Sequence, residues 1–173
     1  PAVALLGEVV MEPEKVVPYF GTVDKPECHM LYNVTTMATT WHTVAVHDTR
    51  LLKKQLDIVN GLPKEYTFLN YLRCHHHIES AGFEQNDAKM EKAIRKDLML
   101  HAYMFMQAGI PMIYSGDEIG QVNDYTYKED EEKRADSRYI HRGAFKWDLA
   151  ENRHDRTTVE GQIFESLSYM EQL

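Results

Sequence analysis

Three apolar runs of this chain each end in polar side chains of the kind that can do acid–base or binding chemistry. Glu8 ends the first run, the histidines His75, His76 and His77 end the second, and Asp117 follows the third. Barrel enzymes place their chemistry at the C-terminal ends of successive parallel strands. The order of these residues therefore favours a site built from the ends of several strands.

The three adjacent histidines are a candidate metal site. In an extended strand His75 and His77 point to the same face, with their Cα atoms about 6.5–7 Å apart. Imidazole nitrogens suit zinc, copper or nickel, and Cys74 or Glu79 could add a ligand. Three consecutive histidines lack a recognised zinc spacing, so the alternative is a hydrated loop that binds zinc or nickel adventitiously. We expect no required cofactor.

Short apolar runs alternate with helical patterns along the chain, which predicts βα units around a parallel sheet. The expected strands are residues 3–10, 28–32, 67–74 and 110–114. The expected helices run from about residues 13 to 21, 35 to 60, 87 to 108 and 158 to 172. The triad-like order of His47, Asp48 and Arg50 falls inside the second helix, where neighbouring residues do not face each other.

These elements predict an α/β fold, a half TIM barrel of about four βα units with parallel strands. A complete eight-stranded barrel needs about 250 residues, and the chain has 173. We expect a single truncated half-barrel domain over residues 1–173, with a long charged loop at 121–157 before the last helix. An open, flavodoxin-like sheet is the alternative architecture.

A half-barrel leaves two open edges on a parallel sheet, and an open edge is a template for another chain. A second copy related by a two-fold axis would cover both edges. The sequence therefore predicts that self-association completes the barrel, in a homodimer or a higher homo-oligomer.

Composition narrows the possible partners and compartment. With 27 acidic and 19 basic residues the net charge is −8, which argues against nucleic-acid binding. No apolar stretch is long enough to span a membrane, and no secretory signal is visible at the N-terminus. Cys28 and Cys74 do not make a disulfide framework, so we expect free thiols in the cytoplasm.

Several ordered motifs together resemble the α-amylase superfamily of glycoside hydrolases, most closely its amylosucrase branch. The run 7–10, Gly-Glu-Val-Val, is similar to the strand that carries the family's general acid. The run 68–75 is similar to the strand before the family's His-Asp pair, and 109–120 to the last barrel strand. The run 136–142 resembles a post-strand loop of the amylosucrase branch. The resemblance implies the C-terminal half of a catalytic (β/α)8 barrel.

The resemblance also implies roles for individual residues. Glu8 matches the general acid, a carboxyl group that must stay protonated near neutral pH. His75, Arg142 and Asp117 match sugar-binding or site-floor positions. Each of two residues also has a non-catalytic interpretation. Glu8 could be a glutamate at the end of a strand that pairs with a nearby base, and Arg142 could form a surface salt bridge.

Two departures from the family pattern predict an impaired or inactive protein. The family's nucleophile, an aspartate of an earlier strand, has no match, and His76 stands where the family has an aspartate. A histidine offers no carboxylate to a cationic transition state, and loss of cooperating groups collapses the rate. We therefore expect a protein acting on α-glucosidic bonds of sucrose or α-glucans, by hydrolysis or glucosyl transfer, with impaired turnover. The alternatives are a non-catalytic, engineered half-barrel fragment and a metal-binding module.

Overall fold

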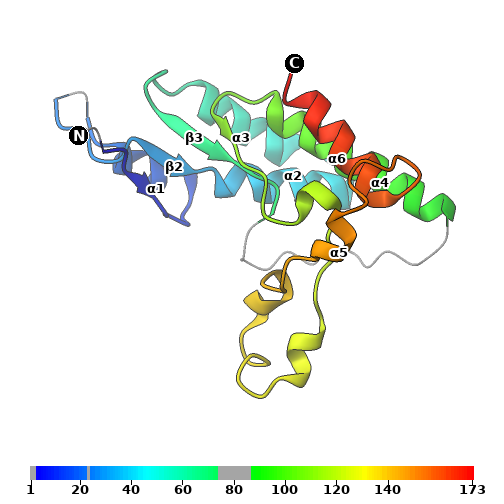
Figure 1. The fold of residues 1–173 in the computed structure, drawn as a ribbon. Helices are drawn as coiled ribbons and strands as arrows, with labels where there is room; N and C mark the ends of the chain where they lie inside the picture. Colours follow the sequence, from blue (N-terminus) through cyan, green and yellow to red (C-terminus); the bar gives the residue numbers. More distant parts are fainter. Residues whose placement is uncertain (1–2, 23, 74–86) are drawn as a thin grey trace. The chain divides into compact units, whose positions relative to one another are not determined.

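The structure is a computed structural model that describes residues 3–22, 24–73 and 87–173 (Figure 1). The chain divides into two compact units. Unit 1 comprises Pro1–Tyr71 and Gln107–Met112, and unit 2 comprises Leu72–Met106 and Ile113–Leu173. The organisation of residues 1–173 as one domain stays a prediction.

Unit 1 contains a four-stranded parallel sheet in the order β1-β2-β3-β4. The strands are β1 (Leu6–Gly7), β2 (Met30–Tyr32), β3 (Thr67–Asn70) and β4 (Ile110–Pro111). The strand order follows the chain, as in a barrel, whereas a flavodoxin-like sheet changes direction at its switch point. The predicted α/β half-barrel of four βα units is therefore confirmed.

The strands are shorter than the apolar runs that predicted them. The run 3–10 contributes only Leu6–Gly7, and 67–74 contributes Thr67–Asn70. β4 holds two residues, and Pro111 has no amide to donate to a ladder. Because β3 ends at Asn70, Arg73 lies beyond the strand rather than within it.

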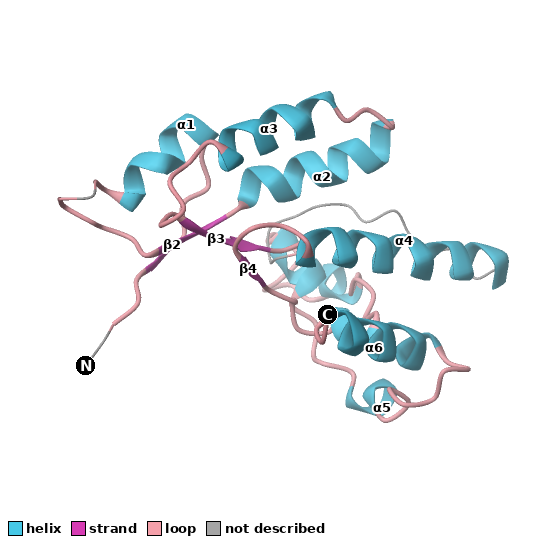
Figure 2. Ribbon diagram, turned by 90° about the horizontal axis from the view of Figure 1, so that it is seen from above, coloured by secondary structure: helices cyan, strands magenta, loops and turns pink. Residues whose placement is uncertain are grey.

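Two helices of unit 1, α2 (Val34–Val46) and α3 (Arg50–Asn60), pack side by side (Figure 2). The prediction of one continuous helix from residue 35 to 60 was wrong. His47 ends α2 with a φ of 56°, in the left-handed region, and reverses the chain. Asp48 then accepts a hydrogen bond from the Arg50 amide at 2.9 Å, as in the turns that precede helices. The triad-like residues therefore form a local turn.

The core of unit 1 lies between the sheet, α1 (Pro13–Val16), the short helix η1 (Val17–Phe20) and α3. Phe20 stacks on Tyr66 with ring centres 4.4 Å apart and meets Phe68 edge-on at 5.2 Å. Cys28 is a half-buried free thiol beside this core, and Cys74 lies outside the described residues. This apolar cluster anchors β2 and β3.

Unit 2 is built on α4 (Asp87–Phe105) and α6 (Val159–Met170), which pack against each other (Figure 2). Their shared core contains Ile94, Ile163 and Leu167. Thr158 caps α6, because its hydroxyl accepts a hydrogen bond from the Gly161 amide at 3.1 Å.

The segments of unit 2 that connect α4 to α6 carry only short helices. They are η2 (Asp117–Ile119), η3 (Thr126–Glu129), η4 (Ser137–His141) and α5 (Trp147–Ala150). In the part of the chain that the structure describes, no helix is long and apolar enough to cross a membrane.

Candidate functional site

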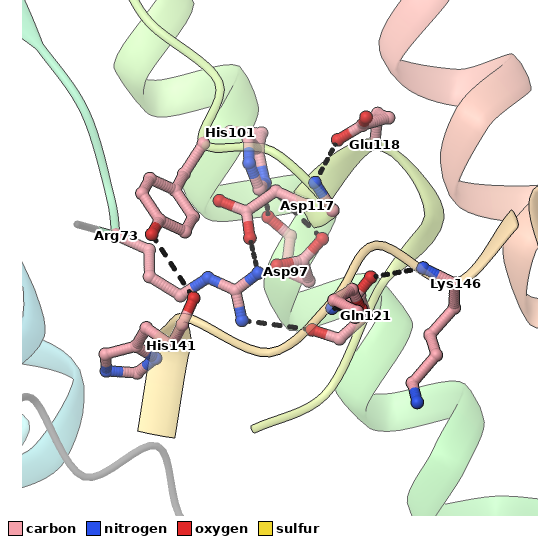
Figure 3. Close-up of polar contacts among 11 residues, drawn as sticks. Arg73, Asp97, His101, Asp117, Glu118, Gln121, His141 and Lys146 are labelled. Carbon is pink, nitrogen blue, oxygen red and sulfur yellow. Dashed lines mark hydrogen bonds and ion pairs between the residues drawn. The ribbon is translucent and has the colours of Figure 1, made fainter. Parts of the chain in front are cut away.

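A buried cluster of charged side chains lies in unit 2 (Figure 3). Arg73 forms an ion pair with Asp117, and the two side chains are only 19% and 11% exposed. A second nitrogen of the same guanidinium donates to the carbonyl oxygen of Gln121 at 3.0 Å. One cation therefore contacts both ends of the turn that contains η2.

The turn around η2 is closed by its own hydrogen bonds, which aim Asp117 inward. The Gly116 amide donates to the Glu118 carboxylate at 2.6 Å, and the Gln121 amide donates to the Gly116 carbonyl at 2.8 Å. Gly116 adopts a φ of 99°, which a side chain would strain. The local sequence Ser-Gly-Asp-Glu at 115–118 thus sets the direction of the buried carboxylate.

Burial raises the pKa of Asp117 to about 6, although Arg73 and His101 both act to lower it. Removing a carboxylate from water disfavours its charged form, and here that effect exceeds the attraction of the nearby cations. The carboxylate is therefore charged at neutral pH but becomes protonated in mildly acidic solution.

His101, on α4, is the second cation of the cluster when protonated. Its ring nitrogen Nδ1 lies 3.1 Å from the Asp97 carbonyl oxygen and 3.4 Å from an Asp97 carboxylate oxygen. Burial acts to lower the pKa of His101, but the contacts with Asp97, together with Asp117, outweigh it and raise the pKa above the usual value. The cluster thus pairs two basic groups with two carboxylates.

The segment that carries Arg142 is bound to this turn. The Tyr114 hydroxyl donates to the His141 carbonyl at 3.2 Å, and the Gln121 side chain binds the Lys146 amide at 3.0 Å. Arg142 itself is exposed, and its guanidinium lies 5.7 Å from the Tyr139 ring centre. Its charge is thus available to a ligand in solution.

The predicted site residues fall in different parts of the chain. Glu8 is exposed, directly after β1 in unit 1, whereas Asp117 and Arg142 belong to unit 2. Of these, only Asp117 belongs to the buried cluster. His75 and His77, the candidate metal ligands, lie outside the described residues. Among the residues that the structure does describe, no group of three or more potential metal ligands occurs.

Two members of the cluster were not found from the sequence. Arg73 was assigned to the interior of a strand, and His101 sits among the apolar positions of a helix. One signal was present: opposite charges, Arg73 and Asp117, follow the ends of neighbouring parallel strands, where such groups meet.

A parallel sheet in chain order, with helices between successive strands, is the arrangement of a partial (β/α) barrel. The protein-family model for the catalytic domain of alpha amylase matches residues 1–162. The chain therefore belongs to the α-amylase family.

One sequence relative agrees with this membership, and two solved structures share the fold. The trehalose synthase of Thermus thermophilus is 29% identical over 145 residues, covering 69% of this chain and 15% of that protein. The crystal structure of the α-amylase from H. orenii superposes with a TM-score of 0.59 at 16% identity, over 98% of this chain and 36% of that one. The trehalose-6-phosphate hydrolase of Bacillus licheniformis gives 0.53 at 15% identity, over 98% and 40%. The chain thus spans less than half the length of each of these three proteins.

Proposed function

We propose that this chain is a carbohydrate-active protein that recognises sugars joined by α-glucosidic bonds, with impaired turnover of its own. The observation that supports this most directly is the family match over residues 1–162, which includes Glu8, Asp117 and Arg142. The sugar class is inferred from the family, and a trehalose synthase is among the sequence relatives.

In this proposal Glu8 is the general acid that protonates the leaving oxygen. Retaining cleavage also needs a second carboxylate about 5–5.5 Å away, which acts as the nucleophile. No residue of this chain matches the family's nucleophile, and His76 stands at the position of a family aspartate. The chain alone is therefore expected to bind sugar better than it cleaves it.

Arg142 is the proposed sugar contact of unit 2, because its guanidinium is exposed on a segment held by several hydrogen bonds. Asp117, whose carboxylate is engaged by Arg73, is proposed to shape the floor of the site. His75 is proposed to contact the sugar as well, but it lies outside the described residues.

Sugar binding tests this function without requiring turnover. We expect calorimetry with the full chain to detect sucrose, maltose or trehalose, and Arg142→Met to weaken that binding. Arg156→Met is the matched control, since Arg156 is an exposed arginine of the same unit, paired with Glu165. Absence of binding for all three sugars at tens of millimolar would refute the proposal.

Turnover then tests the role of Glu8. Any release of glucose from sucrose or a chromogenic α-glucoside should disappear in Glu8→Gln. Turnover that persists unchanged in this variant would remove Glu8 from the mechanism.

We further propose that the chain corresponds to the C-terminal half of a catalytic barrel of the amylosucrase branch. The motif at 136–142 supports this assignment. Sucrose should then bind more tightly than trehalose or maltose, and the reverse order would contradict the branch.

Self-association is proposed for the same half-barrel. In the part of the chain that the structure describes, β1 and β4 are the outer strands of the sheet. Leu6 on β1 and Ile110 on β4 are 40% and 43% exposed, which leaves apolar surface at both edges. Light scattering at micromolar concentration should show a dimer or larger species, and a uniform monomer would rule it out.

A further inference from the structure

Arg73 contacts two residues, Tyr114 and Gln121, that both hold the segment around Arg142. Its guanidinium carbon lies 5.5 Å from the centre of the Tyr114 ring, within the range of a cation–π contact. The hydroxyl of that tyrosine donates to the His141 carbonyl at 3.2 Å. Arg73 therefore supports the residue that fixes the backbone just before Arg142.

The second connection passes through Gln121 (Figure 3). Arg73 donates to the Gln121 carbonyl at 3.0 Å. The side-chain amide of Gln121 donates to the Ala144 carbonyl at 3.2 Å, and its oxygen accepts from the Lys146 amide at 3.0 Å. The backbone just after Arg142 is thus held by a residue whose own carbonyl is bound by Arg73.

Asp124 makes two further close approaches to this segment, one at Ile140 and one at Gly143. The Asp124 amide donates to the Ile140 carbonyl at 2.9 Å. Gly143 lies so close to Asp124 that a Cβ atom there would approach the Asp124 side chain to 3.0 Å. Arg142 is an exposed residue of this segment, with its guanidinium carbon 5.7 Å from the centre of the Tyr139 ring.

The contacts of Asp117 and Gln121 account for the burial of the Arg73 guanidinium in unit 2. A guanidinium that is largely removed from water is stabilised by acceptors for its donors and by a nearby negative charge. Asp117 supplies the counter-charge, and the Gln121 carbonyl supplies an acceptor. The planar fork of arginine serves both partners while its face rests on Tyr114, which the compact ammonium of lysine cannot do.

We propose that Arg73 is a positioning residue: by binding Asp117 and the Gln121 carbonyl while packing on Tyr114, it fixes the 141–146 segment and thereby sets where Arg142 presents its charge. That this charge meets a sugar hydroxyl rests on the proposed function. The positioning itself does not, because it concerns contacts within unit 2.

Amide hydrogen exchange measured by NMR on the full chain tests the positioning directly. In Arg73→Met, which keeps an unbranched apolar stem but removes the guanidinium, the Lys146 amide should exchange about tenfold faster, because Gln121 is no longer held. The Leu167 amide of α6 should keep its rate. Arg95→Met is the matched control, since Arg95 is an exposed arginine of unit 2 that forms an ion pair with Glu91, and it should leave the Lys146 exchange rate unchanged.

Arg73→Lys keeps the charge beside Asp117 and should give an intermediate exchange rate at Lys146. A folded Arg73→Met variant with the wild-type Lys146 rate overturns the proposal. Faster exchange of the Leu167 amide would show that Arg73→Met does not fold. In that case the exchange rate of Lys146 in Arg73→Lys tests the proposal. A wild-type rate at Lys146 in that variant overturns the proposal equally.

Measuring sugar affinity distinguishes the positioning role of Arg73 from the proposed sugar-binding role of Arg142. If the wild type binds sugar, Arg73→Met should weaken binding by a factor similar to Arg142→Met, with the larger effect on KM than on kcat where turnover is seen. Faster Lys146 exchange with unchanged sugar affinity overturns the link to Arg142. Faster exchange in a protein that binds no sugar supports the positioning and refutes the proposed function.

Discussion

Asp117→Asn should reveal which effect dominates the contribution of Asp117 to stability: the cost of burying its charge or the attraction of the ion pair with Arg73. The variant keeps an oxygen that can accept from Arg73 but removes the buried negative charge. If the ion pair dominates, removal of one buried partner destabilises the fold by about 3–5 kcal/mol. If burial dominates, removal of the charge is neutral or stabilising at neutral pH.

The pKa of Asp117 favours the second outcome. Its value of about 6, against 3.8 for the ordinary group, means that the folded state binds the proton more tightly than the unfolded state. The contribution of Asp117 to stability therefore falls as pH rises from about 4 to 6, by about 3 kcal/mol at 1.36 kcal/mol per unit. Above the folded pKa this loss is complete. The variant should match the wild type near pH 4 and exceed its stability by up to about 3 kcal/mol at pH 7.5.

Urea unfolding followed by far-UV circular dichroism at pH 4, 5, 6 and 7.5 measures this difference. Asp136→Asn is a control in which stability should change with pH in the opposite direction, because hydrogen bonds from Arg138 lower the pKa of that half-exposed carboxylate to about 2. The stabilisation of the folded state by the Asp136 carboxylate is present above pH 3.8 and is lost as pH falls toward 2. A variant of Asp117 that is several kcal/mol less stable than the wild type at pH 7.5 would refute the dominance of burial.

Three further changes have defined outcomes. Gly109→Ala should destabilise unit 1 by about 2 kcal/mol or more in urea unfolding, since φ is 125° and a Cβ would lie 2.4 Å from the Phe68 carbonyl oxygen. Thr158→Ala should cost about 1 kcal/mol through loss of the cap of α6, seen as faster amide exchange in its first turn. An NMR titration should show His101 with a pKa above 6.5, lowered in Asp97→Asn. Because the folded pKa is raised, the stabilisation from His101 is full below pH 6.5 and lost as pH rises through the folded value.

The sheet could be predicted because each of its strands leaves an apolar run between helical patterns. The break at His47 could not be predicted in the same way, because the apolar residues on either side of it continue one helical period. A non-glycine residue in the left-handed region gives no periodic signal. The strand ends were also placed too late, since an apolar run continues past the last ladder hydrogen bond.

That late placement explains why Arg73 was overlooked. Residues 67–74 were taken as one strand, which put Arg73 inside it, whereas β3 ends at Asn70 and leaves Arg73 free to turn toward Asp117. His101 was hidden differently, because a histidine on the buried face of α4 looks like an interruption of an apolar stripe. Asp117 was found because it stands in a polar group after a strand.

The raised pKa of Asp117 invites a catalytic interpretation, since enzymes tune carboxyl groups to this range. Its contacts argue against that role. A general acid must reach the leaving oxygen of a substrate, yet only 11% of the Asp117 side chain is exposed and Arg73 occupies it. Burial in a structural network perturbs a pKa as strongly as a reaction site does. Asp117 therefore differs from Glu8, which is exposed and follows β1, and the buried carboxylate is better understood as the anchor of the segment that presents Arg142.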